Sequence, residues 1–189
     1  MTLGNRRRLL ARQRMAPKVT QVTAQLQRER KLGDSDNLEE TVRVKQIMTP
    51  NPARSTPDRT AREVAILMRD NDCGSIPVVE NTTTNRLVGT VTDRDLAIRG
   101  LAAGLGPETA VRDLMTYEPV TCLPEDEVED LRQVMMEQQV RRVPVVDVDG
   151  MLVGIVAQAD IAREEGAASD REVGRIIEAI SEPRSDLPA

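Results

Sequence analysis

Apolar and polar residues alternate along the middle of the chain in two patterns, and each pattern occurs twice. Apolar residues spaced three and four apart predict one amphipathic helix near position 61 and another near position 128. Short unbroken apolar runs bounded by turn residues predict buried strands. The helix faces are Ala61, Val64, Leu67, Met68 and Val128, Leu131, Val134, Met135, and the apolar runs are 76–79, 87–91, 143–146 and 152–156.

The repetition extends to the order and spacing of the elements. Segment 45–49 matches 112–116 at an offset of 67, and after a turn that is longer in the first copy, 87–91 matches 152–156 at an offset of 65. Each copy predicts strand, helix, strand, strand, helix, an α/β (α+β) fold with two pseudo-symmetric repeats. A unit of about 50 to 55 residues buries too little apolar surface to be stable alone. We therefore expect the copies to pack together, with the cleft between them in two related versions.

A polar pair marks the turn from strand to helix after the run 87–91. Thr92 and Asp95 are three residues apart, and the helix is predicted to begin near Asp93. One interpretation is a helix cap, with Thr92 as N-cap and Asp95 at the third helical position. The other is a ligand site at a helix N-terminus. The second copy keeps Asp160 but has Ala157 in place of the threonine. A cap that needed both groups should not lose only one, so the asymmetry favours ligand binding without excluding the cap.

The amino-acid composition excludes several kinds of metal site and of catalysis. The chain has 189 residues, no histidine and a single aromatic residue, Tyr117, so the core must be aliphatic. Zinc sites of the Cys2His2 type and histidine acid–base catalysis are excluded. With no nucleophile–base pair and no glycine-rich phosphate loop, we expect no enzyme. Cys73 and Cys122 are predicted to be core thiols, and with no apolar run of about 18 residues a membrane span is not expected.

Charge is unevenly distributed. Residues 1–31 carry nine basic residues and one acidic residue, a net +8, which leaves −13 on the remainder of a chain whose total is −5. This arm could be solvated and disordered, bind nucleic acid or an anionic membrane surface, or be a transit peptide, and Met15 could be the true start. Near the other end, Val173, Ile176, Ile177 and Ile180 predict an amphipathic helix over 170–181.

Three repeated motifs give the chain a family resemblance. They are Met-Thr near a strand start, hydrophobic-x-Pro-Val-Val, and Gly-hydrophobic-hydrophobic-Thr-x-x-Asp at the strand-to-helix junction. Together they resemble the CBS domain (cystathionine β-synthase domain) family, and a tandem pair of this kind is called a Bateman module. The resemblance implies a stand-alone tandem CBS protein with an N-terminal arm and linker (1–41), repeats at 42–105 and 106–166, and a C-terminal helix and tail (167–189).

The resemblance further implies a binding module for adenine nucleotides (AMP, ADP or ATP) or S-adenosylmethionine-type ligands, with no required cofactor. In site A, Thr92 and Asp95 would hold a ribose, and the second copy would add apolar walls and two arginines for phosphate. Site B is expected to be weak or altered, because Gly74 and Ser75 stand where site A has its arginines. The second-copy members of site A are Val120, Thr121, Val140, Arg141 and Arg142, and site B comprises Ala53, Arg54, Gly74, Ser75 and Asp160, with Ala157 and Cys73 beside them.

Three functions follow as hypotheses. The leading one is a cytoplasmic, homodimeric sensor that transmits ligand occupancy to an unidentified regulated protein. The second is a structural or interaction protein with vestigial clefts, in which Thr92 and Asp95 only cap a helix. The third is nucleic-acid binding through residues 1–31, which lack an aromatic side chain to stack on bases.

Overall fold

The computed structural model describes residues 41–164, so the basic arm and the expected C-terminal helix lie outside the described residues. The strands and the longer helices follow the predicted order in both copies, but a short helix that the pattern did not predict precedes the first strand of each copy. The elements are α2 (Val44–Ile47), β1 (Thr49–Pro50), α3 (Ala61–Asp70), β2 (Ser75–Val79), β3 (Leu87–Thr92), α4 (Asp93–Asp95), the π-helix η2 (Leu96–Leu101), the 3-10 helix η3 (Val111–Asp113), β4 (Thr116–Tyr117), α5 (Val128–Glu137), β5 (Arg142–Val146), β6 (Leu152–Ala157) and α6 (Gln158–Glu164).

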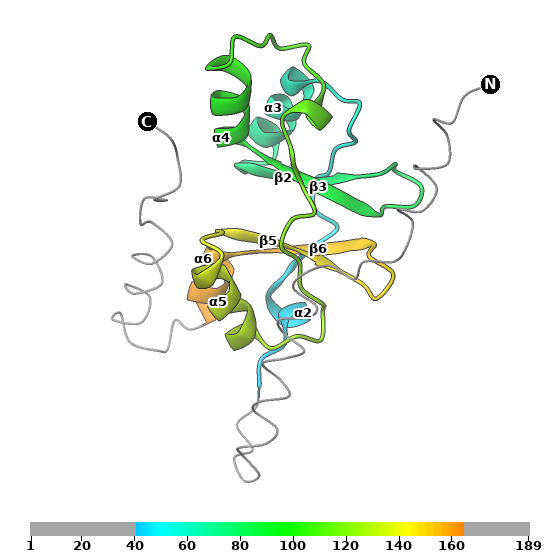
Figure 1. Cartoon of the computed structure of the whole chain (residues 1–189). Coiled ribbons are helices and arrows are strands. Elements are labelled where there is room, and N and C mark those ends of the chain that lie inside the picture. The colour runs from blue at the N-terminus through cyan, green and yellow to red at the C-terminus, as the bar shows by residue number, and fades with distance from the viewer. Residues whose placement is uncertain (1–40, 165–189) are drawn as a thin grey trace, which may run out of the picture.

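The strands form two three-stranded sheets that lie one above the other in Figure 1. Their orders are β2-β3-β4 and β1-β6-β5, so each copy lends its short first strand to the sheet of the other copy. Thr49 pairs with Ile155 across β1 and β6, and Thr116 pairs with Thr90 across β4 and β3. This exchange binds the two repeats into one unit, which agrees with the expectation that neither is stable alone.

Glycines on β3 and β6 make room for the segments that contain the exchanged strands β4 and β1. A Cβ placed on Gly89 would lie 2.8 Å from the sulfur of Met115, and one on Gly154 would lie 2.6 Å from the sulfur of Met48. Both distances are shorter than real Cβ contacts allow, so any larger residue at position 89 or 154 would force the methionine of the repeated Met-Thr to move. The repeated Met-Thr and the repeated glycine are therefore two halves of one contact between copies.

Each copy also contributes residues to the hydrophobic core of the other copy. Val44, which precedes β1 of the first copy, is fully buried among residues of the second copy, and Val111 and Met115 of the second copy are buried in the first. The predicted helix faces are confirmed, because α5 buries all four of its predicted residues and α3 buries Val64 and Met68. The core side chains are aliphatic or sulfur-containing, as the composition required.

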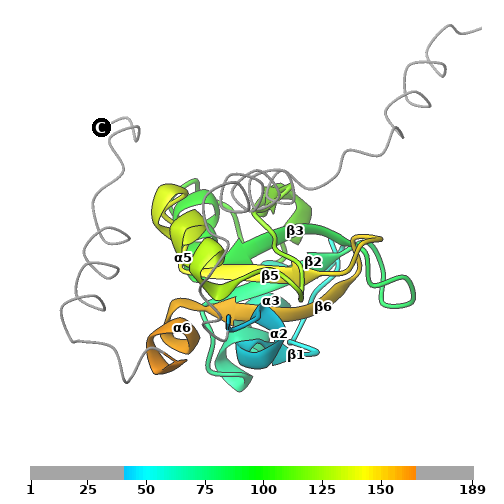
Figure 2. The same cartoon turned by 90° about the horizontal axis from the view of Figure 1, so that it is seen from below.

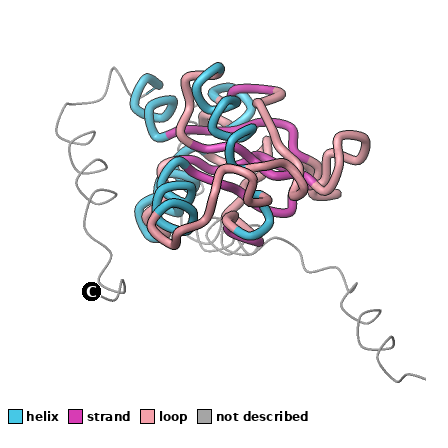
Figure 3. The backbone as a smooth tube through the Cα atoms, turned by 90° about the horizontal axis from the view of Figure 1, so that it is seen from above, coloured by secondary structure: helices cyan, strands magenta, loops and turns pink. Residues whose placement is uncertain are grey.

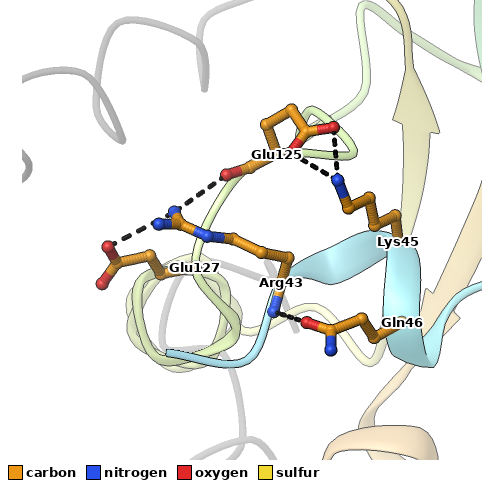
Figure 4. A network of polar contacts seen from close by, with 5 residues as sticks. All are labelled: Arg43, Lys45, Gln46, Glu125 and Glu127. Carbon is orange, nitrogen blue, oxygen red and sulfur yellow. Dashed lines mark hydrogen bonds and ion pairs between the residues drawn. The ribbon is translucent and has the colours of Figure 1, made fainter. Parts of the chain in front are cut away.

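Ion pairs at the protein surface repeat the exchange. Figure 4 shows Arg43, just before α2, and Lys45, within α2, reaching Glu127 and Glu125, which precede α5. The Lys45 Nζ lies 2.9 Å from a Glu125 carboxylate oxygen. At the equivalent place in the first copy, Arg112 pairs with Asp58. Because most of these side chains are exposed, the pairs contribute at most about 1 kcal/mol each.

The two long hairpins join at their tips. The backbone N–H of Leu87 donates to the carbonyl of Gly150 (3.1 Å), and the N–H of Leu152 donates to the carbonyl of Asn85 (2.9 Å). Asn85 and Gly150 are equivalent residues, and both have positive φ angles, 56° and 80°. β3 and β6 therefore start together and run towards the same end of the molecule, where α4 and α6 lie (Figure 1). Figure 3 shows the same separation, with most helices towards one end and the hairpin loops at the other.

The described helices are short. α2 and α6 lie near one another on the side seen in Figure 2. Among the helices of residues 41–164, none combines the length and the apolar character needed to cross a membrane.

Candidate functional site

Thr92 and Asp95 form a reciprocal cap at the start of α4. The Thr92 hydroxyl accepts from the backbone N–H of Asp95 (3.1 Å) and donates to Asp95 Oδ2 (2.7 Å), and that oxygen also accepts from the backbone N–H of Thr92 (2.9 Å). The capping interpretation of the sequence is thus confirmed, and the helix begins at Asp93 as predicted. Whether the same groups also bind a ligand stays a prediction.

The second copy retains half of this arrangement. Asp160 Oδ2 accepts from the backbone N–H of Ala157 at 2.8 Å, with no hydroxyl to complete the pair. The acid alone is therefore sufficient to begin α6, and Thr92 is not a requirement of the repeat's backbone. Asp160 also pairs with Arg163 (2.9 Å) and borders a shallow cavity of about 210 Å³, lined by Gln46, Ile47, Asp160, Arg163 and Glu164.

Strand pairing places other candidate residues beside each junction. Ser75 is the partner of Thr92, and the backbone N–H of Asp93 donates to the carbonyl of Gly74 (3.0 Å). A Cβ on Gly74 would meet the Asp93 carboxylate at 2.8 Å, so the glycine allows this close approach. Gly74 and Ser75, expected in site B, thus lie next to Thr92 of site A.

The arginines lie beside the other junction. Arg142 is the β5 partner of Ala157, and the carbonyl of Arg141 accepts from the backbone N–H of Gln158 (2.9 Å). Both arginine side chains belong to exposed residues. The strand register therefore brings the arginines of site A next to Ala157 rather than directly opposite Thr92. Because the joined hairpin tips direct both junctions to the same end of the molecule, the two sets of residues face the same end of the module (Figure 1).

Two buried polar atoms occupy equivalent positions near the sites. Isolated parallel bridges join Ser55 to β2 and Cys122 to β5, which aligns the preceding residues, Arg54 and Thr121, with the same strands. Arg54 Nε and Thr121 Oγ1 are buried and have no hydrogen-bond partner within residues 41–164. Thr121 is only 2% exposed. Burying a polar group without a partner costs about 1–3 kcal/mol, so a hydrogen bond from a water molecule or a ligand would stabilise either atom.

The apolar candidates pack against the cores. Val120 and Val140 contact the core cluster of the second copy, and Ala53 and Cys73 contact that of the first copy. All four are partly exposed, as residues that form the wall of a binding site must be. Cys122 is a buried core thiol, as predicted, and burial raises its pKa well above the ordinary thiol range.

The motifs singled out in the sequence did not include Arg99. Its Nε lies 3.5 Å from Asp95 Oδ1, and its Nη1 donates to the carbonyl of Leu114 (3.0 Å) and to Thr116 Oγ1 (3.2 Å). The only sequence signal was its position four residues after Asp95, a spacing that favours an ion pair on a helix. Within the described part of the chain, no group of three side chains is arranged to hold a metal ion.

Comparisons with known proteins agree with this architecture. The family model described as "CBS domain" matches residues 44–100 and 111–166. The chain is 40% identical over 138 residues to the CBS domain-containing protein YhcV of Bacillus subtilis, covering 73% of this chain and 94% of YhcV. It is 39% identical over 129 residues to Hypoxic response protein 1 of Mycobacterium tuberculosis, covering 66% and 83%.

Solved structures share the fold. The CBS domain pair of protein MJ0100, in complex with 5′-methylthioadenosine and S-adenosyl-L-methionine, matches with a TM-score of 0.62 and 26% identity over 68% of this chain and 99% of that one. The CBS domain protein PAE2072 from Pyrobaculum aerophilum, complexed with AMP, matches with a TM-score of 0.59 and 26% identity over 67% of this chain and 100% of that one.

Proposed function

The chain belongs to the CBS domain family and carries the domain twice, and on this premise we propose that it is a regulatory module that binds an adenine nucleotide or a related adenosyl ligand between its repeats. Two structurally similar CBS proteins bind AMP or S-adenosyl-L-methionine and 5′-methylthioadenosine. The observation that carries the proposal is the buried, unpartnered Thr121 Oγ1, together with Arg54 Nε at the equivalent position. Thr121 belongs to site A and Arg54 to site B, so a nucleotide in each site would offer a hydrogen-bond partner to one of these atoms.

The chemistry of the proposed main site follows from its groups. Asp95 is a carboxylate with a 15% exposed side chain that can accept from ribose hydroxyls, and Thr92 can donate to ribose or phosphate oxygens. Val120 and Val140 would contact a purine face. Arg141 and Arg142 carry fixed positive charge, and a charge-assisted hydrogen bond from either to a phosphate contributes about 1.5–3 kcal/mol. The second site, with Asp160 but no hydroxyl, is proposed to bind more weakly.

A second candidate function is supported by the observed cap. Because the contacts between Thr92 and Asp95 account for their spacing without a ligand, the chain could be a structural or interaction protein with vestigial clefts. Under this alternative, Asp95 affects folding stability alone.

Calorimetric titration of the full chain with AMP, ADP, ATP and S-adenosylmethionine distinguishes the two functions. We expect at least one of them to bind below about 1 mM. Asp95→Asn, which keeps an acceptor for the cap, should weaken binding at least about tenfold. Asp160→Asn is the matched control and should change the stronger site little. If none of the four ligands binds below millimolar concentration and Asp95→Asn is silent, the structural candidate replaces the sensor.

We propose that occupancy reaches a partner through an assembly of two copies. Two contacting helices of the first repeat carry exposed apolar residues: Ile66 on α3 is 38% exposed, and Ile98 and Leu101 on η2 are 52% and 75% exposed. The equivalent positions of the second repeat hold Gln133 and Arg163, so an interface is best formed by the first repeats of two copies. Ile98→Arg, which copies the second repeat, should convert a dimer measured by sedimentation into a monomer. An unchanged sedimentation coefficient would exclude this surface.

A further inference from the structure

We infer that Arg99 is a positioning residue that ties the carboxylate of Asp95 to the exchanged strand β4, and so connects ligand occupancy to the attachment of the second repeat. The inference rests in part on the proposed function. Its basis is a continuous set of contacts, since Arg99 pairs with Asp95 in its own repeat and donates to Leu114 and Thr116 of the other.

Asp95 divides its two oxygens between different partners. Oδ2 accepts from the backbone and hydroxyl of Thr92, while Oδ1 faces Arg99. Ribose hydroxyls that donate to Asp95 would compete for these oxygens and weaken or reorient the ion pair with Arg99. Since charge-assisted hydrogen bonds are the stronger kind, the position of the guanidinium should respond to the ligand.

β4 depends on such support. It contains only two residues and pairs with β3 at Gly89 and Thr90. Arg99 adds two hydrogen bonds at and just before this strand, one to the carbonyl of Leu114 and one to the side chain of Thr116. A shift of Arg99 would therefore alter the hydrogen bonds at β4, where the second repeat joins the sheet of the first.

The second repeat lacks the same connection. The residue equivalent to Arg99 is Glu164, and Asp160 pairs instead with Arg163, which is three residues away and 78% exposed. The helices differ as well: the residues after Asp95 form a π-helix, in which the Ala102 N–H donates to the carbonyl of Ala97, whereas α6 is an ordinary α-helix. Single π-helical segments are rare and often accompany functional sites.

Hydrogen–deuterium exchange of the full chain tests the inference in two steps. Without ligand, Arg99→Met should make the backbone amides of residues 114–118 exchange about tenfold faster than in the wild type, while α5 is unchanged. Thr116→Val, which removes one acceptor of Arg99 and keeps the size of the side chain, should accelerate the same amides. Arg163→Met is the matched control and should leave them unchanged.

The second step adds AMP at millimolar concentration. AMP should change the exchange of residues 114–118 in the wild type and in Arg163→Met, but not in Arg99→Met, whose AMP binding is followed in parallel by calorimetry. Unaltered exchange in ligand-free Arg99→Met, or a response to bound AMP equal to that of the wild type, would overturn the inference. If the wild type binds AMP too weakly, the ligand among ADP, ATP and S-adenosylmethionine that it does bind takes the place of AMP. A wild type that binds none of the four counts against the proposed function instead, and the ligand-free comparison still decides whether Arg99 holds β4.

Discussion

Replacing Thr92 with alanine separates the cap from the ligand site, because the second repeat already shows the outcome of that change. Thr92→Ala removes an acceptor for the Asp95 N–H and a donor to Asp95 Oδ2. The bond from the backbone N–H of residue 92 to Asp95 remains, as it does between Ala157 and Asp160. The loss of one N-cap side chain costs about 1 kcal/mol, which for a domain of this size lowers Tm by about 3–5 °C.

Urea unfolding and AMP calorimetry on the same variant give the two readouts. If Thr92 also contacts the ligand, AMP affinity should fall about tenfold, the effect of losing one hydrogen bond of about 1.4 kcal/mol. If Thr92 is only a cap, the free energy of unfolding falls and the affinity of the folded protein stays the same.

The reverse substitution is the control. Ala157→Thr places a hydroxyl where the backbone N–H of Asp160 can donate to it, and should stabilise the protein by less than about 1 kcal/mol. Unchanged stability of Thr92→Ala would refute the energetic role of the cap. A loss above about 4 kcal/mol would refute it as well, because no cap contributes that much.

Three further predictions concern the core and the first helix. Cys122 is fully buried, and burial raises its pKa. At about pH 8 an aromatic disulfide reagent should therefore modify the partly exposed Cys73 quickly and Cys122 only when the protein unfolds. Equal rates of modification at the two cysteines would contradict the burial of Cys122. The backbone N–H and the hydroxyl of Thr60 lower the pKa of Glu63, so the Glu63 charge stabilises α3 at pH values above the ordinary carboxyl range, and this stabilisation is lost as the pH falls through the lowered pKa. The difference in unfolding free energy between the wild type and Glu63→Gln should therefore shrink from neutral pH to about pH 3. A difference that stays constant over this range would contradict the prediction. Leu131→Ala should lower the free energy of unfolding measured in urea by about 2–5 kcal/mol, because Leu131 is fully buried. Val148→Ala, at an 89% exposed position, should change it by less than about 0.5 kcal/mol. Similar losses in the two variants would mean that the core is wrongly identified.

The periodic pattern predicted the longer elements because each has one buried face of its own. The spacing of Val128, Leu131, Val134 and Met135 can be satisfied only by a helix with those residues inside, and all four are buried in α5. The central strands β2 and β5 are buried on both faces, so what identified them was an unbroken apolar run.

The sequence could not predict that the first strands are exchanged between the copies, because both copies have the same residue types at the positions that determine strand pairing. Met48 needs a glycine opposite it, and both Gly89 and Gly154 would meet that need. The sequence is equally compatible with pairing inside a copy and with pairing between copies. The same ambiguity affects the arginines, because Arg142 could be assigned to either junction until the register of β5 against β6 was known.

Differences between equivalent positions are therefore more informative than the shared motifs. The two copies place left-handed residues at equivalent positions, Asn51 with Glu118 and Asp72 with Gln139, although the helices that follow the two junctions differ. α6 begins with Asp160 alone. The second repeat forms without a counterpart of the Thr92 hydroxyl or of the Arg99 guanidinium, and in the first repeat both groups contact the carboxylate of Asp95. Under the proposed function both groups would also position the carboxylate for a ligand, so Asp95 is the residue on which that proposal depends most directly.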